Sequence, residues 1–265
     1  MSTNNYTTLS MPVINAYRMD GLGNDFIIVD RRKNSIKLTK EKIIKLGDRK
    51  VLGFDQILFI EKLQNNSYPI TIYNSDGGEV SACGNGARCV AYLLGKNLNI
   101  NEIKLKTSNR LLNAKIVGDF DVELEMGKPL FNFEEIPLSK TINPSNITLN
   151  IEDKIFSGGF CVNVGNPHIV FFVKDCFEHD LKVIGPKIEN HHLFPEKVNV
   201  TFAEVIDKNN IKVNVWERGA GLTKACGTAA CATAVAALKN KSVNNKVDVK
   251  FNEGVLKIEI DNNDN

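Results

Sequence analysis

The chain has 265 residues, of which 43% are hydrophobic and 24% charged, a composition that is typical of a globular protein and argues against disorder over its whole length. Its 33 Lys and Arg residues against 31 Asp and Glu residues leave a net charge of +2, which is too small for a protein that binds nucleic acid through phosphates. No apolar run approaches the roughly 18 residues of a membrane span, and the polar N-terminus lacks the apolar core of a secretory signal. We therefore expect a cytoplasmic protein that binds neither nucleic acid nor membranes.

The elements predicted in chain order are mainly short strands. Residues 1–12 are polar and are predicted to form a flexible tail. Thr39–Leu46 has the pattern of a short amphipathic helix capped by Thr39. Alternating apolar residues or β-branched runs predict strands at Phe26–Val29, Ile57–Ile60, Ile70–Tyr73, Ile103–Lys106, Val122–Glu125, Ile169–Val173, Ile211–Val215, Val247–Phe251 and Leu256–Ile260.

Two segments differ from these strands because they are apolar on all sides. Gly86–Leu94 has a single charge, Arg88, and Ala229–Leu238 has no charged residue. A helix that is apolar all round is buried, so each segment is predicted to form a central helix with strands packed around it.

An internal repeat relates the two halves of the chain. Ala-Cys-Gly occurs at Cys83 and again at Cys226, and the offset between them recurs, to within one residue, in three further pairs: Asn24 and Asn166, Gln56 and Asn199, Asn74 and Glu217. Four landmarks in one order at one spacing indicate two domains of one fold. We predict an α+β protein with two pseudo-symmetric domains, 13–128 and 129–265, each a mixed or antiparallel sheet wrapped around a central buried helix.

Cys83 and Cys226 stand at the starts of the two predicted central helices. A small residue at a crowded helix start explains one such cysteine, but two at equivalent positions favour chemistry. Unpaired N–H groups and the helix dipole are expected to lower a thiol pKa from about 8.5 toward neutrality and to suit a bound carboxylate. No zinc-like spacing exists, so no metal is expected. The remaining cysteines are predicted to be packing thiols: Cys89, Cys161, Cys176 and Cys231.

Two domains facing each other across a pseudo-twofold axis would bring both helix starts to one cleft. One thiolate could then remove the α-proton of a small amino acid while the opposite thiol protonates the other face, which inverts the centre. N–H donors at the carboxylate would stabilise the carbanion-like state. This chemistry needs no pyridoxal phosphate, metal or nicotinamide.

Several motifs together resemble the diaminopimelate epimerase family. The resemblance is carried by Gly21–Phe26, Tyr73–Gly77, Cys83–Cys89, Gly165–His168, Val198-Asn199, Glu217–Gly219 and Ala225–Thr228. It implies interconversion of LL- and meso-diaminopimelate in lysine and peptidoglycan precursor biosynthesis, without pyridoxal phosphate, by a homodimer.

The resemblance also implies the roles of individual residues. Cys83 and Cys226 would be the acid and base thiols, and Glu217 and Arg218 would hold the far end of the substrate. Glu217 and His168 could tune a thiol pKa, although a structural role explains His168 equally well. The α-carboxylate would lie against Gly84, Asn85, Gly227 and Thr228. Further substrate contacts would come from Asn24, Gln56, Asn74, Asn166 and Asn199.

The chain departs from the family pattern in two places. Thr228 is followed by Ala229-Ala230-Cys231, where relatives commonly have Gly-Ala-Cys. Relatives usually continue beyond Leu256–Ile260 with a segment containing T-G-P-A, so we expect the closing strand of the first domain to be missing.

Three other interpretations remain open from the sequence. A proline racemase-like enzyme also uses paired cysteines, but Arg218 beside Glu217 favours a substrate with a charged far end. An inactive binding module of the same fold would normally have lost one of the two cysteines. A redox switch through a disulfide between Cys83 and Cys226 is the third.

Overall fold

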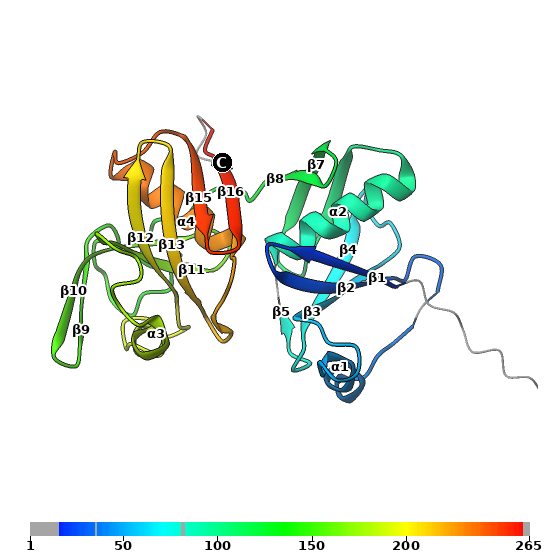
Figure 1. Cartoon of the computed structure of the whole chain (residues 1–265), viewed down its shortest axis with the longest axis horizontal. Coiled ribbons are helices and arrows are strands. Elements are labelled where there is room, and N and C mark those ends of the chain that lie inside the picture. Colours follow the sequence, from blue (N-terminus) through cyan, green and yellow to red (C-terminus); the bar gives the residue numbers. More distant parts are fainter. Residues whose placement is uncertain (1–15, 35, 81–82, 262–265) are drawn as a thin grey trace, which may run out of the picture.

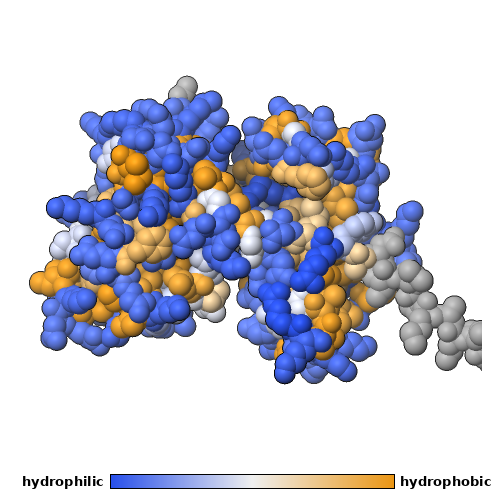
Figure 2. All heavy atoms as spheres, in the orientation of Figure 1, coloured by the Kyte–Doolittle hydropathy of each residue, from blue (hydrophilic) through white to orange (hydrophobic). Residues whose placement is uncertain are grey.

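The computed structural model describes residues 16–34, 36–80 and 83–261, so the tail predicted for residues 1–12 lies outside the described residues. The described chain forms two lobes that lie side by side (Figure 1). We call residues 16–124 the N-terminal lobe, 147–261 the C-terminal lobe and 125–146 the connecting segment. The domain boundary predicted between residues 128 and 129 falls in the connecting segment and stays a prediction. A hollow separates the lobes at the top of the space-filling view (Figure 2).

The described residues of the N-terminal lobe form one 8-stranded sheet and two helices. Its elements are β1 (Ala16–Gly21), β2 (Asn24–Asp30), α1 (Lys40–Gly47), β3 (Gln56–Ile60), β4 (Tyr68–Asn74), β5 (Glu79–Val80), α2 (Gly84–Leu98), β6 (Glu102–Lys106), β7 (Leu111–Gly118) and β8 (Asp121–Leu124). The strands lie in the order β1-β2-β3-β4-β6-β7-β8, and β5 pairs with β4 beside this path.

The C-terminal lobe is a second 8-stranded sheet, also with two helices. Its elements are β9 (Ile147–Ile151), β10 (Lys154–Asn163), β11 (Pro167–Phe172), α3 (Leu181–Glu189), β12 (Asn199–Asp207), β13 (Asn210–Glu217), β14 (Gly221–Leu222), α4 (Gly227–Lys239), β15 (Lys246–Phe251) and β16 (Gly254–Glu259). The strands lie in the order β16-β15-β13-β12-β11-β10-β9, and β14 pairs with β13.

The two sheets share one pairing scheme. From β1 to β7 the neighbouring pairs are antiparallel, parallel, antiparallel, parallel and antiparallel. The same series runs from β10 to β16. The sheets differ at their edges, because β8 extends the first sheet beside β7 whereas β9 extends the second beside β10. The predicted α+β fold of two similar halves with mixed sheets is confirmed.

Each sheet curls around one helix, α2 or α4 (Figure 1). In α4 the small side chains of Ala229, Ala230 and Ala234 have no exposed surface, so the strands approach the helix closely. In α2, Val90 and Leu94 are fully buried, and burial of such a side chain stabilises the fold by roughly 1.5–3 kcal/mol. Both central helices were predicted by their all-round apolar sequences.

A second helix of each lobe packs on the outer face of its sheet. The start of α1 agrees with the prediction, because Thr39 is its N-cap and accepts a hydrogen bond from the N–H of Lys42. Helix α3 was not predicted, because its sequence contains Gly185 and Pro186. The close approach of the Trp216 ring to Gly185 leaves no room for a side chain there, so tertiary packing outweighs the low helix propensity of that residue.

The connecting segment is attached to both lobes. Leu130 exchanges two backbone hydrogen bonds with Asn163 of β10, at 2.8 and 3.0 Å. Arg110, in the turn between β6 and β7, donates to the Met126 carbonyl at 3.0 Å, and its guanidinium lies directly against Gly165. Among the helices that the structure describes, none has the length and apolar character that crossing a membrane demands.

Candidate active site

The two central helices begin beside each other where the lobes meet. Cys83 and Cys226 are the N-caps of α2 and α4 and have nearly the same backbone, with φ −147° and ψ 105° against φ −142° and ψ 115°. The Cα of Gly84 lies 3.9 Å from the position that a Cβ on Gly227 would occupy. Each cysteine directly precedes one of these glycines, so the structure brings the two cysteines, predicted from separate halves, to one junction.

Each cysteine sulfur accepts a hydrogen bond from the first turn of its own helix. The Sγ of Cys83 accepts from the N–H of Gly86 at 3.3 Å, and the Sγ of Cys226 accepts from the N–H of Ala229 at 3.4 Å. The Sγ of Cys226 is also 3.4 Å from the hydroxyl of Thr228. The sulfurs occupy the position at which Ser or Asp oxygens usually cap a helix, so the helix N-termini face the two thiols.

The expectation of lowered thiol pKa values was wrong. Burial raises the pKa of Cys83 to about 11, while the N–H of Gly86 acts in the opposite direction. Burial also raises the pKa of Cys226 well above its ordinary value, and the charge of Glu217 adds to this rise. Cys226 is only 5% exposed. The desolvation of a thiolate at such a position outweighs the favourable helix terminus, and burial of this kind depends on tertiary packing.

Glu217 connects the two thiols electrostatically. It ends β13, and its charge raises the pKa of both Cys83 and Cys226. Burial raises the pKa of Glu217 itself, while a hydrogen bond with Cys226 lowers it. A half-buried carboxylate beside two thiols makes this junction a favourable place for a cation.

Two predicted substrate residues of the N-terminal lobe contact each other. Gln56 and Asn74 are opposite one another on β3 and β4, and the Nε2 of Gln56 donates to the Oδ1 of Asn74 at 2.9 Å. The Oε1 of Gln56 is buried, and no described residue donates a hydrogen bond to it. An unpaired buried acceptor costs about 1–3 kcal/mol, so this oxygen is suited to a donor from a ligand. Asn24, the first residue of β2, is opposite Gly21.

The corresponding residues of the C-terminal lobe are largely bonded to the protein itself. Asn199 is 2% exposed; its Nδ2 donates to the Pro167 carbonyl at 2.8 Å, and its Oδ1 accepts from the N–H of Arg218 at 2.9 Å. The side chain of Asn166 lies 2.9 Å from the Nε2 of His168. Burial lowers the pKa of His168 to about 3, and Arg218 lowers it further, so the ring is neutral near pH 7. The binding and tuning roles of these residues stay predictions.

Arg88 is an additional residue of the junction, to which the sequence analysis assigned no role. Its guanidinium donates to the Oδ1 of Asn85 at 2.9 Å and lies 3.9 Å from the position of a Cβ on Gly227. The Nδ2 of Asn85 in turn donates to the Gly21 carbonyl. The sequence contained a signal that could have pointed to Arg88, because this residue is the one charge in the apolar segment Gly86–Leu94.

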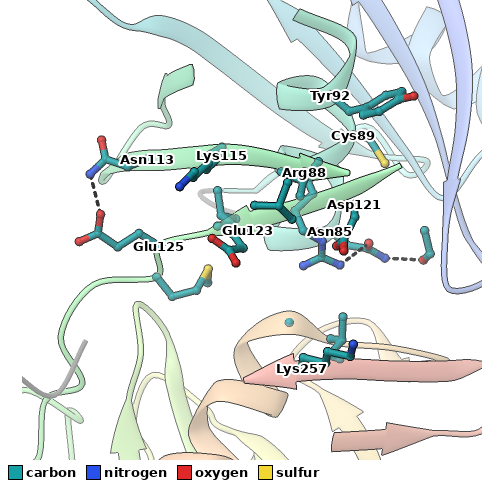
Figure 3. A pocket seen from close by; sticks show the side chains of 18 of the residues that line it. Asn85, Arg88, Cys89, Tyr92, Asn113, Lys115, Asp121, Glu123, Glu125 and Lys257 are labelled. Atoms are coloured by element: carbon teal, nitrogen blue, oxygen red, sulfur yellow. Dashed lines mark hydrogen bonds between the residues drawn. The ribbon is translucent and has the colours of Figure 1, made fainter. Parts of the chain in front are cut away.

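A cavity of about 1800 Å³ lies next to this junction, between the two lobes (Figure 3). Lys115 and Glu123 reach it from the N-terminal lobe and Lys257 from the C-terminal lobe (Figure 3). Cys89 and Cys231 line the cavity, whereas Cys83 and Cys226 are not among its described lining residues. Asn85, Arg88 and Gly227 of the junction also line the cavity, so the cavity adjoins the helix starts without including the two thiols among its lining residues.

The other two cysteines are away from this cavity. Cys161 and Cys176 have no exposed surface. The ligand atoms of Asp175, Cys176 and Glu204 lie within 4.8 Å of one another, the arrangement among the described residues that most resembles a metal site. Burial raises the pKa of Cys176 to about 11, so its thiol is protonated near neutral pH and is a poor ligand.

Several solved structures share this two-lobed architecture. A predicted epimerase from Pseudomonas aeruginosa superimposes with a TM-score of 0.64 and 13% identity, over 95% of this chain and 93% of that one. A hydroxyproline epimerase from Agrobacterium vitis gives a TM-score of 0.58 and 14% identity, over 91% and 82%. At these identities the comparison establishes a shared fold and no activity.

Sequence comparison identifies the family. A family model described as diaminopimelate epimerase matches residues 16–131 and 160–265. A diaminopimelate epimerase of Pelagibacter ubique is 53% identical over 94% of this chain and 92% of that protein, and one of Sphingopyxis alaskensis is 41% identical over 91% and 87%. The chain belongs to the diaminopimelate epimerase family and is an isomerase. The resemblance stated from its motifs is confirmed.

Proposed function

We propose that the protein interconverts LL- and meso-diaminopimelate, with Cys83 and Cys226 as the two acid–base thiols. The observation that carries this proposal is the closeness of the two helix starts. The Cα of Gly84 lies 3.9 Å from the position of a Cβ on Gly227, and each of these glycines directly follows a cysteine. Membership of the diaminopimelate epimerase family supports the choice of substrate. A proline racemase-like activity is less favoured, because the proline-type enzymes share only the fold at 12–14% identity.

The proposed reaction replaces the α-proton with a proton delivered from the opposite face of the α-carbon. A thiolate on one face removes the α-proton, and the thiol on the other face delivers its own proton, so the centre inverts and the thiols exchange protonation states. The first-turn N–H groups of α2 and α4 receive the α-carboxylate, with the hydroxyl of Thr228 beside them. The two thiols supply both the general base and the general acid, and the proposed reaction uses no pyridoxal phosphate.

The raised thiol pKa values suit a reaction of this kind. The α-proton is very weakly acidic, so a strongly basic thiolate makes its removal less unfavourable. The drawback is a small thiolate fraction at neutral pH. The α-ammonium of a bound substrate would bring a positive charge next to Cys83, Cys226 and Glu217, and an adjacent positive charge lowers a thiol pKa.

Two side chains next to each other are suited to the charged groups of the substrate. The carboxylate of Glu217, which affects both thiols, would accept from an ammonium group. The guanidinium of Arg218, whose Nη1 donates to the Glu196 carbonyl at 2.8 Å, has further N–H groups for the far carboxylate. The buried Oε1 of Gln56 would accept from a substrate donor.

The proposed setting follows the family resemblance and the composition. We place the enzyme in the cytoplasm, as a homodimer, in lysine and peptidoglycan precursor biosynthesis. Sedimentation equilibrium of the purified chain tests the dimer, and a monomer at micromolar concentration would contradict it.

The test of function is a stereochemical assay with isotope label. Purified protein is incubated with LL-diaminopimelate in deuterated water, with L-proline in a parallel sample. We expect meso-diaminopimelate carrying deuterium at the inverted α-carbon, and no D-proline. Turnover of proline alone would contradict the substrate, and an inverted product without deuterium would contradict proton abstraction.

A further inference from the structure

Glu189 is a buried carboxylate to which the proposed mechanism assigns no role. It is the last residue of α3 and is only 4% exposed. A buried carboxylate is costly unless hydrogen bonds replace its lost hydration. Its partners therefore show what the residue does.

The two carboxylate oxygens of Glu189 bind both sides of the turn that contains Glu217 and Arg218. Oε2 accepts from the indole N–H of Trp216 at 2.7 Å, and Oε1 accepts from the backbone N–H of Gly219 at 3.1 Å. The ammonium group of Lys197 lies 3.6 Å from Oε1. One carboxylate thus joins the residue before Glu217 to the residue after Arg218.

Two other contacts attach the same turn to the body of the lobe. The backbone N–H of Arg218 donates to Asn199, and the Arg218 side chain donates to the Glu196 carbonyl. The ring of Trp216 packs directly on Gly185 of α3. Glu189 provides the carboxylate of this set, and it binds the indole of Trp216 and the backbone N–H of Gly219.

We propose that Glu189 is a positioning residue, which holds Glu217 and Arg218 in the geometry that receives the charged groups of the substrate. This inference rests on the proposed function, because it assumes that these two residues bind substrate. A carboxylate is required at this position because it offers two acceptors to two N–H donors. A Gln side chain offers one acceptor and would turn an NH₂ group toward the second donor.

The main experiment compares Glu189→Gln with Glu152→Gln as a matched control. Glu152 is an exposed residue that pairs with Lys187 of the same helix α3. In Glu189→Gln we expect the KM for diaminopimelate to rise about tenfold, with kcat within about threefold of the unaltered protein, because substrate binding is lost more than acid–base chemistry. The control variant should keep both constants.

Trp216 supplies a readout that does not depend on activity, because it is the single tryptophan of the sequence. A negative charge at the indole N–H stabilises the excited state, in which the pyrrole ring loses electron density. The emission maximum should therefore move to shorter wavelength in Glu189→Gln and stay unchanged in Glu152→Gln.

A second variant approaches the same contact from the other side. Trp216→Phe keeps an aromatic ring against Gly185 and removes the N–H donor, so its KM should also rise. The double variant with Glu189→Gln should be less impaired than the two single effects combined, because both remove one interaction. This variant keeps the proposal testable if Glu189→Gln does not fold.

The outcomes separate this inference from the proposed function. An unchanged KM in Glu189→Gln overturns the positioning role even if the emission shifts, and an unchanged emission overturns the contact. Strictly additive effects in the double variant also overturn it. Absence of diaminopimelate turnover in the unaltered protein overturns the proposed function instead, and the emission of Trp216 then still decides whether Glu189 holds the turn.

Discussion

The two lobes share a strand order but carry different side chains at equivalent strand ends. In the N-terminal lobe Gln56 lies opposite Asn74, and both are uncharged. In the C-terminal lobe the register that pairs Val200 with Trp216 puts Asn199 opposite Glu217. The cysteines differ too, since Cys83 is half-buried and Cys226 is 5% exposed. The repeated backbone therefore provides two similar thiol positions, while of these four strand-end residues only Glu217, in the C-terminal lobe, is ionisable.

The largest expected effect comes from removing one thiol at a time. Cys83→Ala and Cys226→Ala should each lower epimerisation by about 10²–10⁴-fold, because one of two proton transfers loses its donor or acceptor. In deuterated water the remaining thiol should still exchange the α-proton of one stereoisomer without inverting it. The two variants should label opposite stereoisomers, as measured by NMR of each purified isomer.

Two results would contradict the proposal that Cys83 and Cys226 act as equivalent thiols on opposite faces of the α-carbon. Near-full epimerisation in either variant would exclude a two-thiol mechanism. Labelling of the same stereoisomer by both variants would show that the cysteines do not face opposite sides of the α-carbon.

The dependence of rate on pH should follow the raised thiol pKa values. Because burial raises the pKa of Cys83 to about 11, the thiolate fraction of the free enzyme increases by about tenfold per pH unit below that value. We expect kcat/KM to rise from pH 6 upward with no plateau near neutrality. A plateau of kcat/KM beginning below pH 8 would contradict the raised thiol pKa and would support the lowered value expected from the sequence.

A smaller effect should follow from adding a methyl group at either helix start. A Cβ on Gly84 would lie 3.6 Å from Met126, and one on Gly227 would lie 3.9 Å from Gly84, both ordinary contacts. Gly84→Ala and Gly227→Ala should therefore keep the unfolding free energy but lower kcat/KM by about tenfold, because each methyl group stands where the α-carboxylate is proposed to bind.

Gly118→Ala, at the end of β7, serves as the matched control for these two variants, since its added Cβ would also make an ordinary contact. Full activity in both helix-start variants would move the carboxylate site away from this junction.

The smallest predicted effect compares the caps of the two outer helices. Thr39 caps α1 through a 3.4 Å hydrogen bond, whereas Asp180 caps α3 through a 3.0 Å bond and adds a negative charge at the helix N-terminus. Thr39→Ala should cost about 1 kcal/mol of unfolding free energy and Asp180→Ala up to about 2 kcal/mol. Urea unfolding measures both, and a larger loss for Thr39→Ala would reverse the expected order.

Much of the fold could be predicted because local patterns and the repeat agree. The apolar segments after Cys83 and Cys226 predict α2 and α4, and the offset pairs anticipate matching positions in the two sheets. Helix α3 could not be predicted, because Gly185 and Pro186 disfavour a helix locally and the Trp216 ring that stabilises it comes from a distant strand. Seven strands were also not predicted: β1, β5, β7, β9, β10, β12 and β14.

The candidate site, too, could be predicted from the sequence only in part. The motif residues could be selected by type and spacing, and their roles stay predictions. The 3.9 Å between the Cα of Gly84 and the position of a Cβ on Gly227 agrees with the pseudo-twofold argument. The thiol pKa values and the position of Glu189 could not be obtained this way. Both depend on which groups are enclosed, and enclosure is decided by packing between segments far apart in the sequence.

The bridge between Leu130 and Asn163 has a mechanical consequence. The chain passes once between the lobes, and this bridge fixes the later part of the connecting segment to the C-terminal lobe. Any rotation of one lobe relative to the other must then be absorbed by the backbone between Glu125 and Pro129. Gly127, with φ of 76° and nothing within 4 Å of a would-be Cβ, lies at the middle of this short stretch and is its natural pivot.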